Sequence, residues 1–415
     1  MKKLFCILLA FCLLLTACAA PAGPSESYEP GPTAAFLDGD ASMPESTAED
    51  GDSEPEASAS PESSAPAPSA EPEQDEPADP LLARVHVSEP ELIYTDKELK
   101  FTLDGSFCTL RQDDGSVLYW ETANGSNYPP FLLYKGTEDD PLQEWLGLFE
   151  WDFGEVRHNR ASTLWVQNFY QYEDGTLIGF VHREDLARNN DEGMNNFWIG
   201  LGISEDGGYH WKYLGDVLGT VMNWKMTDAD GQPNMGGVPY IVHDGYFYIY
   251  YNEYITRTTR YIACARMSVE ETLACAKEGT LPEVRKYDGE GWDADPFTDY
   301  GAPVIPGSTD GYMDSHADAV WCEPLGRYLM TVQTHAKGNL WMFLSEDGVH
   351  WDQKILIDSV KTGDTMHPYS TFVGLEDSSA DFSTVGSRFY LYFPRKGMGR
   401  NYNHDDLYRV TVTIE

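Results

Sequence analysis

The sequence predicts an all-β fold, a five-bladed β-propeller with four-stranded antiparallel blades. The first observation behind this prediction is a recurring turn that contains Gly and is followed at once by an aromatic-rich apolar run. It occurs at Asp114-Gly115, Asp174-Gly175, Asp244-Gly245, Leu325-Gly326 and Val385-Gly386. Such turns between apolar runs indicate β-hairpins, because Gly supplies the positive φ that tight turns need. Five hairpins at intervals of about 60 to 80 residues are typical of a propeller, in which each repeat forms one radial sheet.

The second observation is a pair of turns with a common spacing. They read Ser204-x-Asp206-x-Gly208-x-x-Trp211 and, one residue shorter, Ser345-x-Asp347-Gly348-x-x-Trp351. Both match the Asp-box, in which the Asp accepts hydrogen bonds from its own turn, Gly permits the turn and Trp packs into the blade. We expect these turns at the outer edges of blades two and four, where they stabilise the architecture and do not bind ligand.

The elements of each blade follow from the apolar runs beside the Gly turns. We expect an inner strand and a second strand in each blade, at 106–110 and 116–122, 164–170 and 176–182, 239–242 and 246–251, 317–322 and 328–333, and 370–373 and 389–393. The one predicted helix covers 269–277. The run 407–414 alternates apolar and polar residues, as a half-buried strand does. We predict that one terminus completes a blade begun at the other, because closing the ring removes its exposed sheet edges.

The first residues predict a secreted, lipid-anchored protein. A basic start and the apolar run Leu4–Leu15 precede Leu15-Thr16-Ala17-Cys18, which resembles the bacterial lipobox. We expect a lipoprotein signal peptide at 1–17 and a lipid on Cys18 that holds the chain on the extracytoplasmic face of the bacterial membrane. The alternative is an ordinary signal peptide cut near Ala20.

Composition separates a tether from the folded domain. Residues 18–80 are rich in Pro, Ser, Ala and acidic residues, a composition that predicts a disordered tether, and the propeller domain is expected at 81–415. The whole chain has a formal charge of −40, and 81–415 alone about −26. A domain this acidic is not expected to bind nucleic acid, which requires a basic face. We expect a monomer without a cofactor, with Ca²⁺ near the propeller axis as the alternative.

Four cysteines remain in the predicted domain, Cys108, Cys264, Cys275 and Cys322. Four cysteines allow three disulfide pairings, and their spacing does not choose among them. They are too far apart in the sequence for a zinc site. Free, buried cysteines are the favoured interpretation.

The hairpins and the Asp-boxes together make residues 100–395 resemble five-bladed propeller glycoside hydrolases of the family 43 and family 32 type, and more distantly sialidases. In the family 43 type the general base is an Asp within Asp-Pro-Ser at the first inner strand. Asp104-Gly105-Ser106 occupies that place here. The family also places a His on a late inner strand near the substrate or a central cation, where this chain has Asp314-Ser315-His316-Ala317-Asp318.

Three features of the chain depart from that resemblance. The family's acid is a Glu in Glu-Gly-Pro before the third inner strand, where this chain has Gly236-Gly237-Val238-Pro239. The family's middle Asp falls near Gln167-Asn168, again without a carboxylate. The three arginines and the Tyr–Glu pair of sialidases cannot be assigned. The general acid must therefore lie elsewhere, or the site does not hydrolyse.

Our first hypothesis is a membrane-anchored, extracellular glycosidase-like protein that acts on oligo- or polysaccharides. Asp104 would be the general base, and Glu184 or Glu253, each near the end of a second strand, would be the acid with a raised pKa. Residues expected to contact the sugar are His182, Asp314, His316, Asp318, His367 and Tyr369. No metal ligands are predicted. The alternatives are a non-catalytic carbohydrate-binding lipoprotein and a structural or protein-binding propeller.

Overall fold

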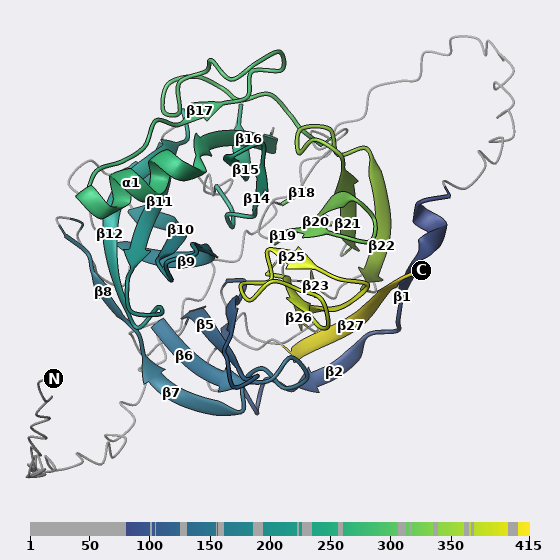
Figure 1. Ribbon diagram of the computed structural model, residues 1–415. Helices are drawn as coiled ribbons and strands as arrows, with labels where there is room; N and C mark the ends of the chain where they lie inside the picture. Colours follow the sequence, from purple (N-terminus) through teal and green to yellow (C-terminus); the bar gives the residue numbers. More distant parts are fainter. Residues whose placement is uncertain are drawn as a thin grey trace, which may run out of the picture. The chain divides into compact units, whose positions relative to one another are not determined.

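The computed structural model describes residues 80–99, 102–103, 105–124, 131–154, 156, 162–185, 194–221, 224–225, 235–255, 260–305, 313–314, 318–334, 339–360, 365–366, 369–396 and 406–415. These residues belong to the compact unit Glu73–Glu415. They form five sheets arranged around a ring, so the predicted five-bladed propeller is confirmed (Figure 1). In this part of the chain no helix is long and apolar enough to cross a membrane. The predicted signal peptide, Cys18 and the tether to residue 79 lie outside the described residues.

Each blade is built around a four-stranded core of neighbouring strands. Blade one holds β3 (Thr102–Leu103), β4 (Cys108–Arg111), β5 (Val117–Asn124), β6 (Phe131–Gly136) and β7 (Glu144–Leu148). Blade two holds β8 (Glu150–Asp152), β9 (Ser162–Gln171), β10 (Leu177–Asp185), β11 (Met194–Ser204), β12 (His210–Gly219) and β13 (Trp224–Lys225). Blade three holds β14 (Tyr240–His243), β15 (Tyr246–Tyr254), β16 (Arg260–Ser268) and β17 (Arg285–Lys286).

The last two blades contain segments from distant parts of the chain. Blade four holds β18 (Met313–Asp314), β19 (Ala319–Cys322), β20 (Arg327–Thr334), β21 (Asn339–Ser345), β22 (Gln353–Ser359) and β25 (Thr384–Val385). Blade five holds β1 (Val85–Val87), β2 (Glu91–Tyr94), β23 (Thr365–Met366), β24 (Thr371–Gly374), β26 (Arg388–Lys396) and β27 (Asp406–Ile414). The 3-10 turn η1 (Leu82–Arg84) precedes β1.

The inner hairpins of the first four blades lie close to their predicted places. β4, β9, β14 and β19 each pair antiparallel with the next strand. The turn glycines have the positive φ that the sequence predicted, +82° at Gly115, +86° at Gly175, +79° at Gly245 and +59° at Gly326. The predicted helix is also confirmed, as α1 (Val269–Glu278). Ser268 caps its N-terminus, where the side chain accepts a hydrogen bond from the Glu271 N–H, and Gly279 caps its C-terminus in the left-handed conformation.

The fifth predicted turn, Val385-Gly386, is wrong. β24 and β26 do pair, but residues 375–387 form a long connection between them. Val385 lies in β25, which pairs in parallel with β19 of blade four near the centre of the ring (Figure 1). Gly386 is needed here for close packing and does not form a tight turn. A Cβ at this position would lie 2.5 Å from the Glu376 carbonyl oxygen. Pairing with a neighbouring blade has replaced the tight local turn.

The ring closes as predicted, by pairing of the two ends of the domain. β27 pairs with β26 on one side and with β1 and β2 on the other. Val85 lies opposite Ile414, and the Glu415 N–H donates to the Arg84 carbonyl at 2.9 Å. The N-terminal strands thus form the outer edge of the blade that the C-terminus ends.

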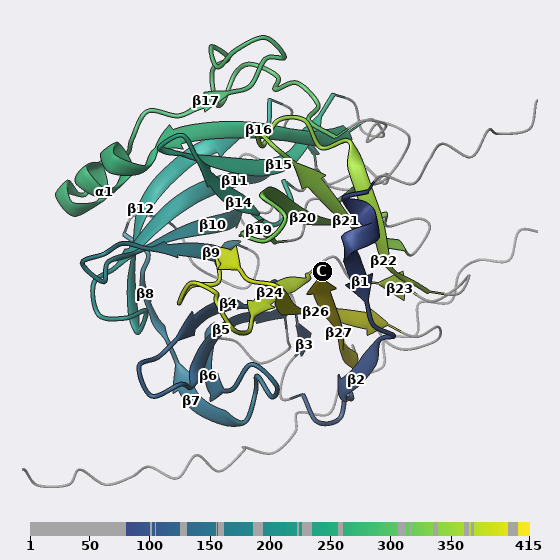
Figure 2. The same ribbon diagram turned by 45° about the vertical axis from the view of Figure 1, so that its right-hand side comes forward.

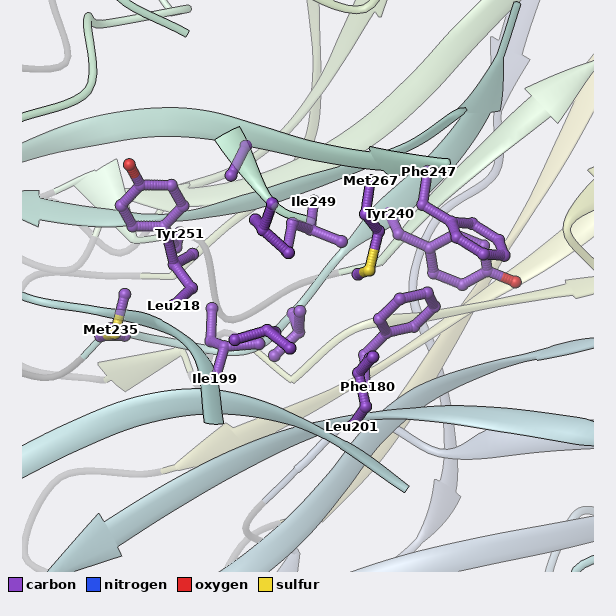
Figure 3. Close-up of a cluster of buried hydrophobic side chains, with 14 of the residues drawn as sticks. Phe180, Ile199, Leu201, Leu218, Met235, Tyr240, Phe247, Ile249, Tyr251 and Met267 are labelled. Atoms are coloured by element: carbon purple, nitrogen blue, oxygen red, sulfur yellow. The ribbon is translucent and has the colours of Figure 1, made fainter. Parts of the chain in front are cut away.

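Apolar side chains fill the spaces between neighbouring blades. Between blades two and three, Phe180, Ile199 and Leu201 face Tyr240, Phe247 and Ile249 (Figure 3). All six are at most 4 % exposed. Successive side chains along a strand point to opposite faces of the blade, so that one set packs against the preceding blade and the other against the following blade. Among the described cysteines, Cys108, Cys264, Cys275 and Cys322 are free, and only Cys275 is not fully buried.

The two Ser-Asp-Gly-Trp turns connect neighbouring blades. The Gly208 carbonyl accepts from Trp211 Nε1 at 2.9 Å and from Trp120 Nε1 of blade one at 2.7 Å. The Gly348 carbonyl accepts from Trp351 Nε1 at 3.0 Å and from the Tyr250 hydroxyl of blade three at 2.7 Å. Each turn therefore joins its own blade to the preceding one.

Candidate functional site

The direction of the strands defines two faces of the ring. The tight turns at Gly115, Gly175, Gly245 and Gly326 lie on one face, which we call the turn face. Because paired strands are antiparallel, the starts of the inner strands and the ends of the second strands lie on the opposite face, here called the front face. The two Ser-Asp-Gly-Trp turns join the third and fourth strands and therefore also belong to the turn face.

Five of the buried polar atoms that lack a hydrogen-bond partner lie towards the front face of blades one and two. They are Ser106 Oγ, Glu121 Oε1, Trp165 Nε1, Gln167 Oε1 and His182 Nδ1, each without a partner among the described residues. Each of these residues lies just before or on an inner strand, or towards the front end of a second strand. Buried polar groups are nearly always hydrogen-bonded in native proteins, and exceptions often mark a functional site. We call these five residues the front-face polar cluster.

Glu121 is the most unusual member of the front-face polar cluster. It lies in β5, opposite Leu132 of β6, and its side chain is 1 % exposed. Burial raises the pKa of Glu121 to about 8, so its carboxyl group is protonated at neutral pH. A neutral carboxyl group can donate a proton, as a general acid must. Sequence analysis found no carboxylate for that role before the third inner strand, where the family 43 type has its Glu.

Sequence analysis missed Glu121, although its signal was present. Glu184 and Glu253 were selected because each lies near the end of a second strand. Glu121 lies in the second strand of blade one, directly after the buried Trp120. The same rule, applied to the first blade, would have found it.

His182 and Glu184 form a pair near the front end of β10. The His182 Nε2 lies 3.3 Å from the Glu184 Oε1. The imidazole is 4 % exposed and lies between Trp165 and Phe197, with ring centroids at 5.6 and 6.1 Å. The Glu184 side chain is only partly buried. The two aromatic rings fix the imidazole, which in turn orients a carboxylate that solvent can reach.

Glu253 lies in a buried ion pair. Its Oε2 accepts from Lys286 Nζ at 3.0 Å, from the Gly301 N–H at 3.0 Å and from the Tyr251 hydroxyl at 3.1 Å. Both charged side chains are fully buried. The second oxygen, Glu253 Oε1, has no partner among the described residues. The ion pair with Lys286 gives Glu253 a structural contact, and its role as a general acid stays a prediction.

Asp318 connects blade four to blade five. Its Oδ1 accepts from the Ala319 N–H at 2.9 Å and its Oδ2 from the Phe372 N–H at 3.0 Å. Burial raises its pKa to about 7. With Cys108 and Asn168 it lines a cavity of about 10 Å³, which is about the space that one water needs. A sugar ring does not fit there, so these contacts indicate a structural role for Asp318.

The connection 375–387 crosses the axis on the turn face; we call it the axial loop. The Ala380 carbonyl accepts from the Arg111 N–H of blade one at 2.8 Å, and the Ser383 carbonyl from the Trp321 N–H of blade four at 2.8 Å. Asp381 Oδ2 accepts from the Gln171 N–H of blade two at 3.3 Å. Phe382 and Ser383 line the small axial cavity. The axial loop thus covers the centre of the ring on the turn face. A ligand would therefore approach the centre from the front face.

The other predicted site residues are only partly described. Asp104, His316 and His367 lie outside the described residues. The backbone of Asp314 lies in β18, opposite Gln333 of β20. Tyr369 is partly buried and precedes Ser370, whose hydroxyl lies 2.6 Å from that of Thr331. Within the described ranges, no three His, Cys, Asp or Glu side chains are grouped as metal ligands would be.

Comparisons with known proteins find similarity to solved structures alone. No family model and no curated protein matches the sequence. Similar solved structures include a protein of unknown function from Dyadobacter fermentans, with 16 % identity, TM-score 0.44, and coverage of 79 % of this chain and 80 % of that one. An α-L-arabinanase from Penicillium chrysogenum, in complex with arabinobiose, has 14 % identity, TM-score 0.41 and coverage of 79 % and 98 %. A thermostable family-43 glycoside hydrolase has 15 % identity, TM-score 0.45 and coverage of 76 % and 92 %.

Proposed function

We propose that this chain is a glycosidase-like protein that hydrolyses oligo- or polysaccharides at the front face of its propeller. The observation that carries the proposal is Glu121, a buried carboxyl group whose pKa is raised to about 8 and whose Oε1 lacks a partner among the described residues. Four other polar groups without a partner among the described residues lie towards the front face of blades one and two. Those groups suit a ligand with many hydroxyl groups, because hydroxyls both donate and accept hydrogen bonds.

In this mechanism Glu121 is the general acid. In its protonated form it would donate its proton to the leaving glycosidic oxygen. A second carboxylate would take a proton from the attacking water, and Asp104 remains our predicted base. Glu184, oriented by His182, is the alternative base, since its side chain is partly exposed. Sugar contacts by Asp314, His316, His367 and Tyr369 stay predictions.

The test is turnover of chromogenic arabinosides, xylosides, fructosides and galactosides by the full chain and by Glu121→Gln. With a poor leaving group we expect kcat to fall about 100-fold or more in the variant, because proton donation is lost. With a dinitrophenyl leaving group, which needs no proton, we expect nearly full activity. Glu150→Gln, at a carboxylate that is 75 % exposed on β8, is the control. Equal rates for wild type and Glu121→Gln on the poor leaving group would refute the role of Glu121.

A second candidate function is carbohydrate binding without hydrolysis. It is favoured by the buried segment Gly236–Val238, which precedes the third inner strand and holds no carboxylate where the family 43 type has its acid. Isothermal titration with oligosaccharides would distinguish the two functions. Binding without turnover of any substrate would support this candidate over the enzyme.

We also propose that the protein acts outside the cell, held on the membrane by a lipid on Cys18. The Leu15-Thr16-Ala17-Cys18 sequence supports this proposal. Labelling of the expressed protein with radioactive palmitate tests it. Wild type should incorporate the label, and label in Cys18→Ala equal to wild type would exclude Cys18 as the lipid site.

A further inference from the structure

Two aromatic side chains are exposed on the segment 295–301 after β17, which we call the rim loop. Phe297 is 41 % exposed and Tyr300 is 42 % exposed. The chain turns around Asp295, just before Phe297, and the Asp295 Oδ1 accepts from the Phe297 N–H at 2.9 Å and from the Thr298 N–H at 3.0 Å. Two large rings three residues apart on one loop are therefore each partly exposed to solvent.

The rim loop lies towards the front face of the ring. The Pro296 carbonyl accepts from the N–H of Gly219, the last residue of β12. The Gly301 N–H donates to Glu253, near the front end of β15. Both strands begin at the turn face, so their ends lie on the front face, where the polar cluster also lies. The segment can be followed beyond β17 at the outer edge of blade three (Figure 2).

The rim loop is held by buried contacts. Lys286 Nζ donates to the Asp299 carbonyl at 2.8 Å and to the Gly219 carbonyl at 3.3 Å. The Tyr261 hydroxyl donates to the Gly301 carbonyl at 2.7 Å. These bonds, with the ion pair of Lys286 and Glu253, fix the backbone that carries the two rings. A platform fixed in advance loses little conformational entropy when it binds a ligand.

We propose that Phe297 and Tyr300 form a secondary binding platform for a neutral polysaccharide. The inference rests on the proposed function at the front face. Aromatic faces pack against the C–H faces of sugars, and nearby carboxylates accept hydrogen bonds from hydroxyls. Residues 287–301 contain five acidic residues and no Lys, Arg or His. That charge repels uronate or sulfate groups, so a neutral polymer is the ligand that fits.

The platform would hold a long chain beside the axial site while one part of it reaches the front-face polar cluster. Two linked contacts raise the overall affinity for a polymer without changing the affinity for a short substrate. Loss of the platform should therefore weaken polymer binding and leave turnover of small chromogenic glycosides unchanged.

The test is affinity electrophoresis of the full chain in gels that contain neutral arabinan, galactan, xylan or fructan. Wild type should be retarded by at least one neutral polymer, and the Phe297→Ala/Tyr300→Ala variant should bind it about tenfold more weakly. Leu356→Ala, at a residue on β22 that is 46 % exposed, is the matched control and should behave as wild type. Polygalacturonate, an anionic polymer, should not retard the protein.

Three results would overturn the inference: no retardation of wild type by any neutral polymer, equal retardation of the double variant, or equal retardation by polygalacturonate. Failure of the proposed catalysis would be seen differently. A protein that binds neutral polymers through Phe297 and Tyr300 but hydrolyses no substrate would retain the platform and lose only the enzymatic role.

Discussion

Replacement of Lys286 by Met should destabilise the domain strongly. Lys286 and Glu253 are both 0 % exposed, and Lys286 Nζ also donates to two backbone carbonyls. The methionine side chain fills a similar volume but leaves the Glu253 charge buried without its partner. Removing one member of a buried ion pair costs about 3–5 kcal/mol. With about 2.1 cal/mol/K of unfolding entropy for each of about 335 residues, Tm should fall by about 4–7 °C.

Differential scanning calorimetry and urea unfolding of the full chain measure this loss. The control is Lys277→Met, because both side chains of the Lys277–Asp174 pair are exposed and such surface pairs contribute little to stability. The double variant Glu253→Gln/Lys286→Met should be more stable than Lys286→Met, since no unpaired charge remains. A loss in Lys286→Met no larger than in the control would refute the idea that this ion pair holds the rim loop.

Three further predictions address the pH dependence, the turns and the axial loop. Between pH 5 and 8 the stability should fall, because burial raises the pKa of Glu121 to about 8 and that of Asp318 to about 7, so that ionisation favours the unfolded chain. Glu121→Gln should remove on the order of 4 kcal/mol of that fall in urea titrations at the two pH values. Gly208→Ala should destabilise by about 2 kcal/mol or more by calorimetry, because φ is +90° and the new Cβ would lie 2.4 Å from the Trp120 ring; an unchanged Tm would contradict this. Arg111→Ala should lower the free energy of unfolding by about 2 kcal/mol or more, because the Arg111 guanidinium donates to the Gly374 and Leu375 carbonyls at 2.8 Å. The amides of residues 375–387 should also lose protection in hydrogen exchange, and unchanged protection would contradict the role of Arg111 in holding the axial loop.

Local patterns were sufficient to predict most of the fold. The hairpin at Asp244-Gly245 depends on residues adjacent in the sequence, and β14 and β15 begin within one residue of their predicted places. The same holds for α1, whose Ser268 and Gly279 ends are local signals. The turn at Val385-Gly386 failed because β25 pairs with β19, a partner about 60 residues away that no local pattern reveals.

The candidate site was less predictable, because its chemistry depends on burial and distant partners. Glu253 and Glu184 occupy similar places in their strands, but Lys286 binds only Glu253, and nothing near residue 253 in the sequence shows this. For Glu121, by contrast, the raised pKa comes from burial in the folded domain, which its neighbours in the sequence do not show. The axial loop likewise depends on contacts between four blades that only the closed ring brings together.

The position of β27 has a consequence for how the protein is made. This strand consists of nearly the last residues of the chain, Asp406–Ile414, and one of its partners, β1, begins at Val85. Contacts across so long a separation form late, because the loop between them is expensive in entropy to close. During synthesis, β1 and β2 must wait for a partner that follows them by about 310 residues, and β26 presents an open edge until the same strand arrives. The nascent ring is therefore most exposed to aggregation in the interval before β27 has been made.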